Sequence, residues 1–346
     1  MARRTPPLLA LLAAAAALHP AGCDGAVEPV TLTVYTSVDD EIAREILARY
    51  GAGSGVKVDV VSDTEATKTV GLANRLLDEG RPGRTPRADL FWNNEPVWTV
   101  RLAESGVLER YESPSAKDVP AAYRDPAGFW TANGLRARLF IVNGGMAKER
   151  RPSSYADLAD PAFRGAGSLA RPLAGTCLSH MAALRAVLGP DPFAKWFKDM
   201  AANETAFASG NGAVAREVGR GTRAFGFTDT DDFHVRRTAG DPVEAVFPDQ
   251  GPLQVGTFVL PVTVSLVRGA PHRGEAVKLY DWLVSAETEA ALSGTSYATI
   301  PVRPSTKPGP GAVSLSSFRP AKAAWSEAVK NIDPVLDIAK EVLQGK

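Results

Sequence analysis

The sequence contains little cysteine and little histidine. Among its 346 residues are two cysteines, Cys23 and Cys177, and four histidines. Two thiols cannot build a zinc cluster made of cysteines, and they leave no internal disulfide if Cys23 is modified. The few scattered histidines argue against an imidazole-rich metal site. A metal site in this chain would therefore depend on oxygen ligands.

An excess of basic charge is also missing. Lysine and arginine together number 39, as do aspartate and glutamate, so the formal net charge is zero. A nucleic-acid-binding protein usually carries a basic surface, so nothing here recommends nucleic acid as a partner.

An apolar run near the N-terminus follows two basic residues. The run Leu8 to Leu18 follows Arg3 and Arg4, and it is too short to span a bilayer. We therefore expect residues 1–22 to be a secretory signal peptide. Because Cys23 follows two small residues, the cleavage region resembles a lipoprotein signal, although Pro20 stands where leucine is preferred.

Two outcomes follow from this N-terminal pattern. In the first, Cys23 becomes acylated and residues 23–30 form a tether from a membrane surface to the folded body. In the second, ordinary cleavage releases a soluble periplasmic protein. Either outcome predicts a location in the periplasm or cell envelope.

The remaining chain is long enough for two lobes. From Thr31 to Trp92, short apolar strands alternate with amphipathic helices, which is typical of an α/β fold with parallel strands. Two further apolar runs, Leu135–Asn143 and Thr257–Val267, interrupt this alternation and suggest strands that cross between lobes. The predicted boundaries are 31–134 for the first part of lobe 1, 135–256 for lobe 2, 257–312 for the second part of lobe 1, and 313–346 for a C-terminal helical segment packing on lobe 2.

A cluster of carboxylates follows the apolar segment that begins at Phe225. Asp229, Asp231 and Asp232 lie within four positions at the expected C-terminal end of a buried strand, where open α/β sheets form ligand sites. Crowded carboxylates usually coordinate a metal, hold an amine or cap the next helix. The cluster is therefore a candidate ligand site.

An ordered set of short segments carries a resemblance to a known family. These segments are Val34 to Ser37, Ala88 to Trp92, Arg136 to Arg138 with Val142-Asn143, Gly226 to Thr228, and Ala276 to Leu283 with Ser285 to Glu287. Together they resemble the ferric-iron-binding extracellular solute-binding proteins of bacterial ABC importers. The resemblance implies a two-lobed type II periplasmic-binding fold, with two interlobe crossover strands, that closes on a ligand. It also implies a permease and its ATPase as partners, a monomeric state and no catalytic activity.

The resemblance also implies a metal site. The matching ligand positions are Asp39 after the first strand, Glu95 or its neighbour Asn94 after the third, and Asp231 with Asp232 after the late strand. The relatives have a tyrosine pair at that last position, which this chain lacks. Carboxylates suit hard cations in general, so the metal would be ferric iron or another hard cation.

A second set of matching positions implies an anion site. Ala174, Gly175, Thr176 and Asn211 lie at two expected helix starts, and Arg138 lies on the crossover strand. Amide groups at a helix N-terminus attract anions, and a guanidinium adds a forked contact. Such a site would hold carbonate or phosphate beside the metal.

Further ligand contacts are expected near the first strand and in the acidic cluster. The candidates are Tyr35, Ser37, Asn94 and Asp229.

Two other functions remain open. A pocket with acids on one wall and helix N-termini on the other would also suit a phosphorylated or phosphonylated solute such as an aminoalkylphosphonate. The sequence Asp229-Thr230-Asp231 also superficially matches the Asp-x-Asp of haloacid-dehalogenase-type phosphatases. That motif should follow the first strand of its fold, however, whereas here it comes late in the chain.

Overall fold

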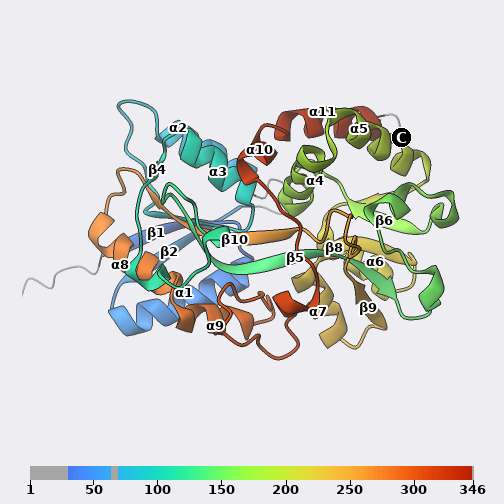
Figure 1. The fold of residues 1–346 in the computed structure, drawn as a ribbon. Coiled ribbons are helices and arrows are strands. Elements are labelled where there is room, and N and C mark those ends of the chain that lie inside the picture. The colour runs from blue at the N-terminus through green and yellow to red at the C-terminus, as the bar shows by residue number, and fades with distance from the viewer. Residues whose placement is uncertain (1–29, 64–68, 345–346) are drawn as a thin grey trace, which may run out of the picture.

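The computed structural model describes residues 30–63 and 69–344, so the expected signal peptide, the tether through residue 29 and Cys23 lie outside the described residues. The molecule consists of two α/β lobes lying side by side, with long strands passing between them (Figure 1).

Lobe 1 is built from the N-terminal third of the chain and a returning segment. Its strands are β1 (Thr31–Thr36), β2 (Lys57–Ser62), β3 (Leu90–Asn93), β4 (Leu108–Glu109) and β10 (Val259–Val267). Its helices are α1 (Asp40–Ser54), α2 (Val70–Glu79), α3 (Pro96–Glu104), α8 (Arg273–Leu283) and α9 (Ala286–Ser293), with short 3-10 helices at Pro114–Ala116 and Ala121–Tyr123.

Lobe 2 is built from the middle of the chain. Its strands are β6 (Gly167–Ala170), β7 (Ala206–Ala208), β8 (Phe225–Asp229) and β9 (Val243–Val246), and it shares β5 (Thr131–Asn143) with lobe 1. Its helices are α4 (Gly175–Leu188), α5 (Pro190–Ala202), α6 (Asn211–Gly219) and α7 (Thr230–Thr238), with 3-10 helices at Lys148–Arg150, Tyr155–Ala159 and Pro161–Phe163.

One sheet path runs through both lobes in the order β2-β1-β3-β10-β5-β8-β6-β7. The strand β5 pairs with β10 as far as Ala137 and with β8 from Arg138 onward, so it passes from one lobe to the other at that point. The pairs β1–β2, β1–β3, β6–β7 and β6–β8 are parallel, whereas β10 and β5 are antiparallel to their neighbours. In each lobe, the carboxyl ends of the parallel strands therefore face the space between the lobes.

Local sequence explains where these elements begin and end. Helix α1 buries Ile42, Ile46 and Tyr50 at helical spacing, and it ends at Gly55, whose φ of 71° is a left-handed conformation that glycine adopts readily. Strand β8 is buried along its whole length, because sheet neighbours and helices cover both of its faces. Helix α7 begins directly after it, with two carboxylates in its first turn, where the helix dipole favours negative charge.

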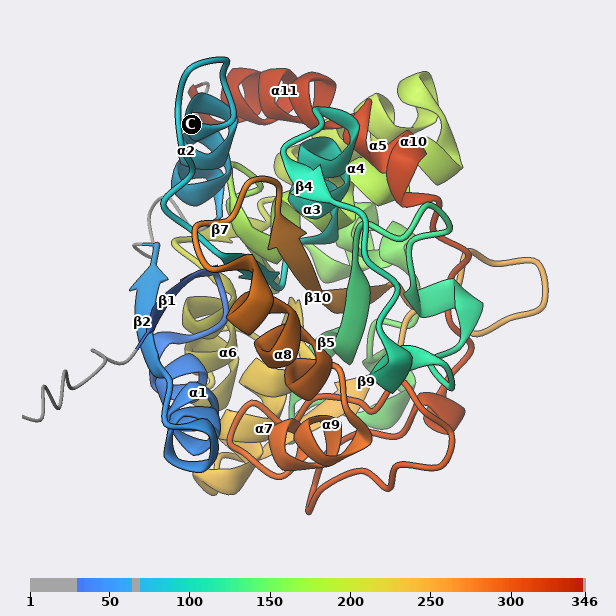
Figure 2. The same ribbon diagram turned by 90° about the vertical axis from the view of Figure 1, so that its left-hand side faces the viewer.

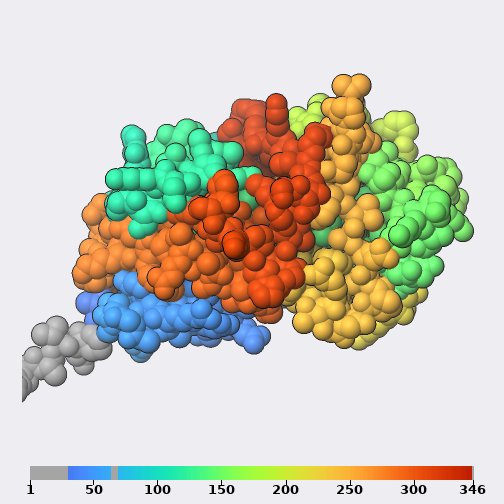
Figure 3. Space-filling view, turned by 60° about the horizontal axis from the view of Figure 1, so that its bottom comes forward, coloured from blue at the N-terminus to red at the C-terminus, as the bar shows by residue number. Residues whose placement is uncertain are grey.

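The C-terminal segment contacts both lobes. Helix α10 (Trp325–Val329) packs against α3 of lobe 1 and α4 of lobe 2, and α11 (Ile332–Gln344) packs against α4 and α5. The preceding chain, which includes a 3-10 helix at Leu315–Ser317, lies across the boundary between the lobes (Figure 3). The prediction placed this segment against lobe 2 alone. The structure adds a contact with lobe 1, between α10 and α3.

Turning the molecule by 90° brings lobe 1 to the front and shows two opposite ends of the molecule (Figure 2). Helices α2 and α11 lie at one end, and α1, α7 and α9 lie at the other. Over the part of the chain that is described, no helix combines the length and the apolarity needed to cross a bilayer.

Candidate ligand-binding site

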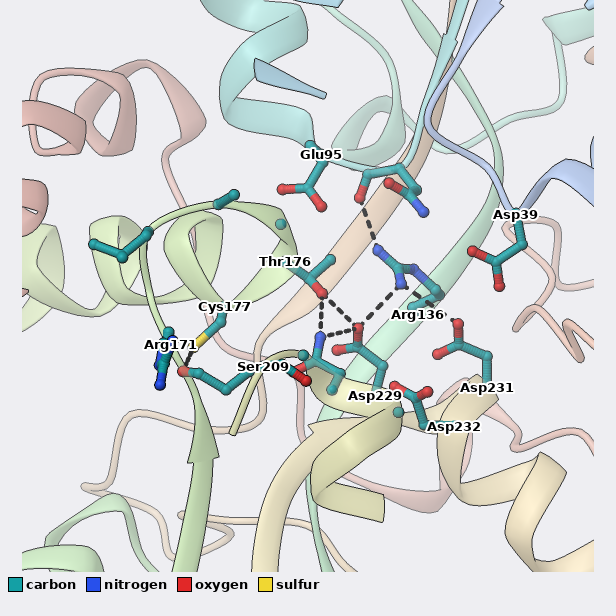
Figure 4. Close-up of a pocket in the computed structure, with 18 residues that line it drawn as sticks. Asp39, Glu95, Arg136, Arg171, Thr176, Cys177, Ser209, Asp229, Asp231 and Asp232 are labelled. Atoms are coloured by element: carbon teal, nitrogen blue, oxygen red, sulfur yellow. Dashed lines mark hydrogen bonds and ion pairs between the residues drawn. The ribbon is translucent and has the colours of Figure 1, made fainter. Parts of the chain in front are cut away.

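A cavity of about 450 Å³ lies between the two lobes. Lobe 1 contributes Asp39, Asn94 and Glu95 to its wall, and lobe 2 contributes the first residues of α4 and α6 together with the acidic cluster. In Figure 4, Glu95 and Asp39 approach from lobe 1, Asp229, Asp231 and Asp232 lie opposite them, and Arg136 lies between the two groups. The structure thus brings together the four side chains predicted as metal ligands.

Asp229 is the centre of a buried hydrogen-bond network. Its Oδ1 accepts from Arg138 Nη1 at 2.6 Å, and its Oδ2 accepts from Thr176 Oγ1 at 2.6 Å, from Arg136 Nη1 at 3.0 Å and from Asn211 Nδ2 at 3.1 Å. Burial opposes ionisation of this carboxyl, but the two guanidinium groups and the hydrogen bonds lower its pKa to about 2. Asp229 lines the cavity, yet its oxygens are committed to protein donors.

Asp231 and Asp232 lie in the first turn of α7. Asp231 Oδ2 lies 3.4 Å from Arg136 Nη1, and Asp232 Oδ2 accepts from Thr228 Oγ1 at 2.9 Å. One oxygen from each of Asp229, Asp231 and Asp232 lies within 4.8 Å of the other two. Burial, followed by the charges of Asp231 and Asp229, raises the pKa of Asp232 well above its usual value. The three carboxyl groups are therefore close enough that the charges of Asp229 and Asp231 oppose ionisation of Asp232.

Arg136 is a site residue that the sequence analysis did not select. Its Nη1 donates to Asp229, its Nη2 donates to the carbonyl oxygen of Asn94 at 2.9 Å, and its guanidinium lies 5.8 Å from the centre of the Tyr297 ring. Two-residue spacing on β5 places Arg136 and Arg138 on one face of the strand, and this spacing could have identified the pair.

The first residues of α4 and α6 line the cavity, as predicted for Ala174, Gly175, Thr176 and Asn211. Neither helix has a side-chain hydrogen bond at its N-cap. The amide groups of a first helical turn have no partners within the helix, so these helix ends offer donors to the cavity.

The structure does not place Tyr35, Ser37 or Arg138 on the cavity wall. The Tyr35 hydroxyl donates to Glu79 Oε1 at 2.9 Å in the core of lobe 1, and Ser37 donates to Asn93 and Asn94. Arg138 is fully buried, and its guanidinium lies 4.7 Å from the centre of the Phe227 ring. Arg138 therefore contacts the residues of the cavity wall through Asp229 and Asn211.

Other residues of the cavity wall escaped prediction because they lie in loops or beside predicted residues. They are Ala170, Arg171, Leu173, Cys177, Ser209, Gly210 and Gly212. Arg171 is exposed and adds a positive charge near the start of α4. Five carboxylates nevertheless line the cavity against two guanidinium groups, so the wall as a whole favours a ligand with positive charge.

A polar cavity between two α/β lobes, with strands crossing between them, is the arrangement of proteins that close on a small ligand. Residues 45–316 match the family described as bacterial extracellular solute-binding protein, and the chain belongs to that family. This confirms the predicted class of protein.

Individual relatives agree with this membership. The chain is similar to Iron uptake protein A1 of Synechocystis sp., with 26% identity over 281 residues that cover 78% of this chain and 75% of the relative. It also resembles the ferric binding protein from Campylobacter jejuni, with a TM-score of 0.80, 22% identity, and coverage of 90% of this chain and 99% of that one.

A third relative was solved with a different kind of ligand. It is the periplasmic binding protein AfuA from Actinobacillus pleuropneumoniae with exogenous fructose-6-phosphate bound. Its TM-score is 0.76 at 21% identity, and 90% of this chain and 98% of that chain are covered. These structures confirm the predicted two-lobed type II periplasmic-binding fold.

Proposed function

We propose that this protein is the solute-binding component of a bacterial ABC importer and that its ligand is a hard metal cation, ferric iron. The observation that supports this best is the acidic wall, where oxygens of three carboxylates lie within 4.8 Å of one another in a cavity between two lobes. Relatives named for iron uptake and ferric binding point to the same ligand.

The proposed ligands are Asp231 and Asp232 from lobe 2 and Asp39 from lobe 1. Asp229 is an unsuitable ligand because four protein donors already use its oxygens. Carboxylate oxygens suit hard cations, and the amide ends of α4 and α6 could hold an accompanying anion such as carbonate or phosphate. Glu95 lines the same cavity, but its Oε2 accepts a hydrogen bond from Ser179.

A pair of neighbouring aspartates provides a matched test. Asp39 and Asp40 are both exposed at the start of α1, but only Asp39 lines the cavity, whereas Asp40 pairs with Arg44. We expect Asp39→Asn to weaken ferric binding by about tenfold or more and Asp40→Asn to leave it unchanged, measured by competition with a coloured chelator. Equal affinities for the two variants would contradict the proposed ligand set.

A phosphorylated organic solute is the second candidate. The cavity volume of about 450 Å³ is larger than a single ion requires, and Arg171 and two helix N-termini line one part of it. The structure of AfuA with fructose-6-phosphate shows that a protein of this fold can hold such a ligand. Tight binding of a sugar phosphate or an aminoalkylphosphonate in the presence of excess chelator would favour this candidate over the metal.

The remaining assignments follow from the role of a solute-binding component. The proposed partners are a membrane permease and its ATPase, and the proposed state is a monomer outside the cytoplasmic membrane, anchored through a lipid on Cys23. We propose no catalytic step for the protein. The Asp-x-Asp resemblance does not support one, because Asp229 is held by two arginines and is poorly placed to attack phosphorus.

A further inference from the structure

A hydrogen bond joins the two lobes beside the cavity. Ser179, in the second turn of α4, donates from its Oγ to Glu95 Oε2 at 2.9 Å. Glu95 belongs to lobe 1 and directly precedes α3. Both residues are buried, with exposures of 0% for Ser179 and 1% for Glu95. A charged hydrogen bond in such a dry position is stronger than one at the surface.

The position of Glu95 compensates for a missing cap on α4. The N-cap residue Ala174 makes no side-chain hydrogen bond, and the first turn of α4 contains no acidic residue. A Cβ atom built on Gly175 would lie 3.7 Å from Glu95 Oε1, so the carboxylate lies against this first turn. Negative charge at a helix N-terminus is stabilising, and here the opposite lobe supplies it.

Apolar contacts support the same boundary between the lobes. Helix α10 packs against both α3 and α4, and one hydrophobic cluster includes Val97 and Trp98 of α3 together with Leu178 and Met181 of α4. The hydrogen bond between Glu95 and Ser179 lies at the cavity end of this contact, and Glu95 also lines the cavity.

We propose that Glu95 and Ser179 form a latch that holds the lobes closed, and that Glu95 serves in closure instead of binding the metal. Moving the lobes apart would break this hydrogen bond and remove the carboxylate from the first turn of α4. The latch therefore adds to the stability of the closed form and slows release of whatever ligand the cavity holds. Ser179 does not line the cavity, so it would control release without touching the ligand.

The test uses Ser179→Ala, which removes the donor, Glu95→Ala, which removes the acceptor, and the double variant. Small-angle scattering of each protein without added metal measures closure directly, and stopped-flow transfer of ferric iron to a chelator measures release. We expect both single variants to have a larger radius of gyration and to release iron about tenfold faster, which corresponds to roughly 1.4 kcal/mol. The double variant should behave like either single variant, because each removes the same hydrogen bond.

Ser265→Ala is the matched control. Ser265 is fully buried in β10, and its hydroxyl has no hydrogen-bond partner among residues 30–63 and 69–344, so its loss removes a buried hydroxyl without touching the latch. This variant should scatter and release iron like the unaltered protein.

Three results would overturn the latch. Ser179→Ala could match the unaltered protein while Glu95→Ala abolishes iron binding, which would make Glu95 a metal ligand. A second contradicting result is a double variant whose changes in radius of gyration and release rate equal the sum of those of the two single variants. A third is that neither single variant changes the scattering profile. The scattering measurement needs no metal, so it decides on the latch even if ferric iron proves to be the wrong ligand.

Discussion

Asp229 connects four elements through a single carboxylate. Asp229 lies at the end of β8, and it accepts hydrogen bonds from residues of β5, α4 and α6. Replacing one member of a buried ion pair leaves the remaining charges poorly compensated. The site therefore depends on a side chain whose oxygens are committed to protein donors.

Asp229→Asn should consequently destabilise the fold by on the order of 3 kcal/mol, since Arg136 and Arg138 would lose their shared counter-ion. Urea unfolding at neutral pH measures the change in the free energy of unfolding. The exposed pair Lys195 and Asp199 provides a control, because Asp199→Asn should cost less than about 1 kcal/mol. A loss for Asp229→Asn as small as that of the control would contradict a structural role.

The same carboxylate predicts a pH dependence. Its pKa is about 2 in the folded protein against a usual value of 3.8. A lowered pKa means that its contribution to stability is present above pH 4 and is lost as the pH falls toward 2. The unfolding free energy of the unaltered protein should decline through this window, and that of Asp229→Asn should decline less.

Asp232 should behave in the opposite sense. Burial and neighbouring charges raise its pKa well above 3.8 in the folded protein, so its contribution to stability is present below pH 4 and is lost as the pH rises through the raised value. Asp232→Asn should therefore unfold at a higher urea concentration than the unaltered protein at pH 8, while losing cation binding. Lower stability of this variant at pH 8 would contradict the raised pKa.

Close packing between strand β8 and helix α6 fixes the position of α6 beside the site. A Cβ atom built on Gly226 would lie 2.3 Å from Val214 Cγ1, so only glycine lets α6 approach the strand this closely. The first residue of α6 is Asn211, which donates to Asp229. A change within the core of lobe 2 would thus reach the cavity wall.

Gly226→Ala should push α6 away from β8 and cost about 1–3 kcal/mol of stability, with weaker ligand binding as a consequence. Thermal unfolding and ligand titration measure the two effects. Gly274→Ala is the control, because a Cβ atom there meets nothing within 4 Å and the residue lies in α8 away from the cavity. Equal melting temperatures for the two variants would show that the close approach does not matter.

We expect the two lobes to move relative to one another about the strands that join them. Strand β5 runs through both lobes and pairs with β10 of lobe 1, with an irregularity between Val262 and Thr263. We expect ferric iron to reduce the radius of gyration, because a ligand held from both walls favours the closed form. Ser179→Ala should start from a larger value and shrink more on binding. An unchanged scattering profile at saturating ligand would contradict a hinge.

Attachment to a membrane is the other prediction at this scale. Mass spectrometry of the membrane fraction should find a mature N-terminus at Cys23 carrying lipid, while Cys177 stays unmodified because it is buried in α4. An N-terminus at another residue, or an unmodified Cys23, would contradict lipid anchoring. Cys177 is a poor site for modification in any case, since burial raises the pKa of its thiol to about 12.

The sequence by itself determined the elements of the fold and the acidic wall. Apolar periodicity is a local property, so it located α1, β8 and the two crossing strands, and the strand end placed Asp231 and Asp232 at the cavity. Short strands such as β7 and β9 were not predicted, because three or four residues are too few to show a regular alternation of apolar and polar residues. The family resemblance added Asp39 and Glu95 as cavity residues.

Only the tertiary structure decided what each side chain does there. Sequence cannot show that Asp229 is surrounded by four donors, that Arg138 lies beneath the wall, or that Arg136 faces the cavity beside it. Nor can it show that Glu95 meets Ser179 across the lobes, 84 positions along the chain. Whether a carboxylate binds a ligand or closes a cavity depends on neighbours that are distant in sequence, and only the folded chain brings them together.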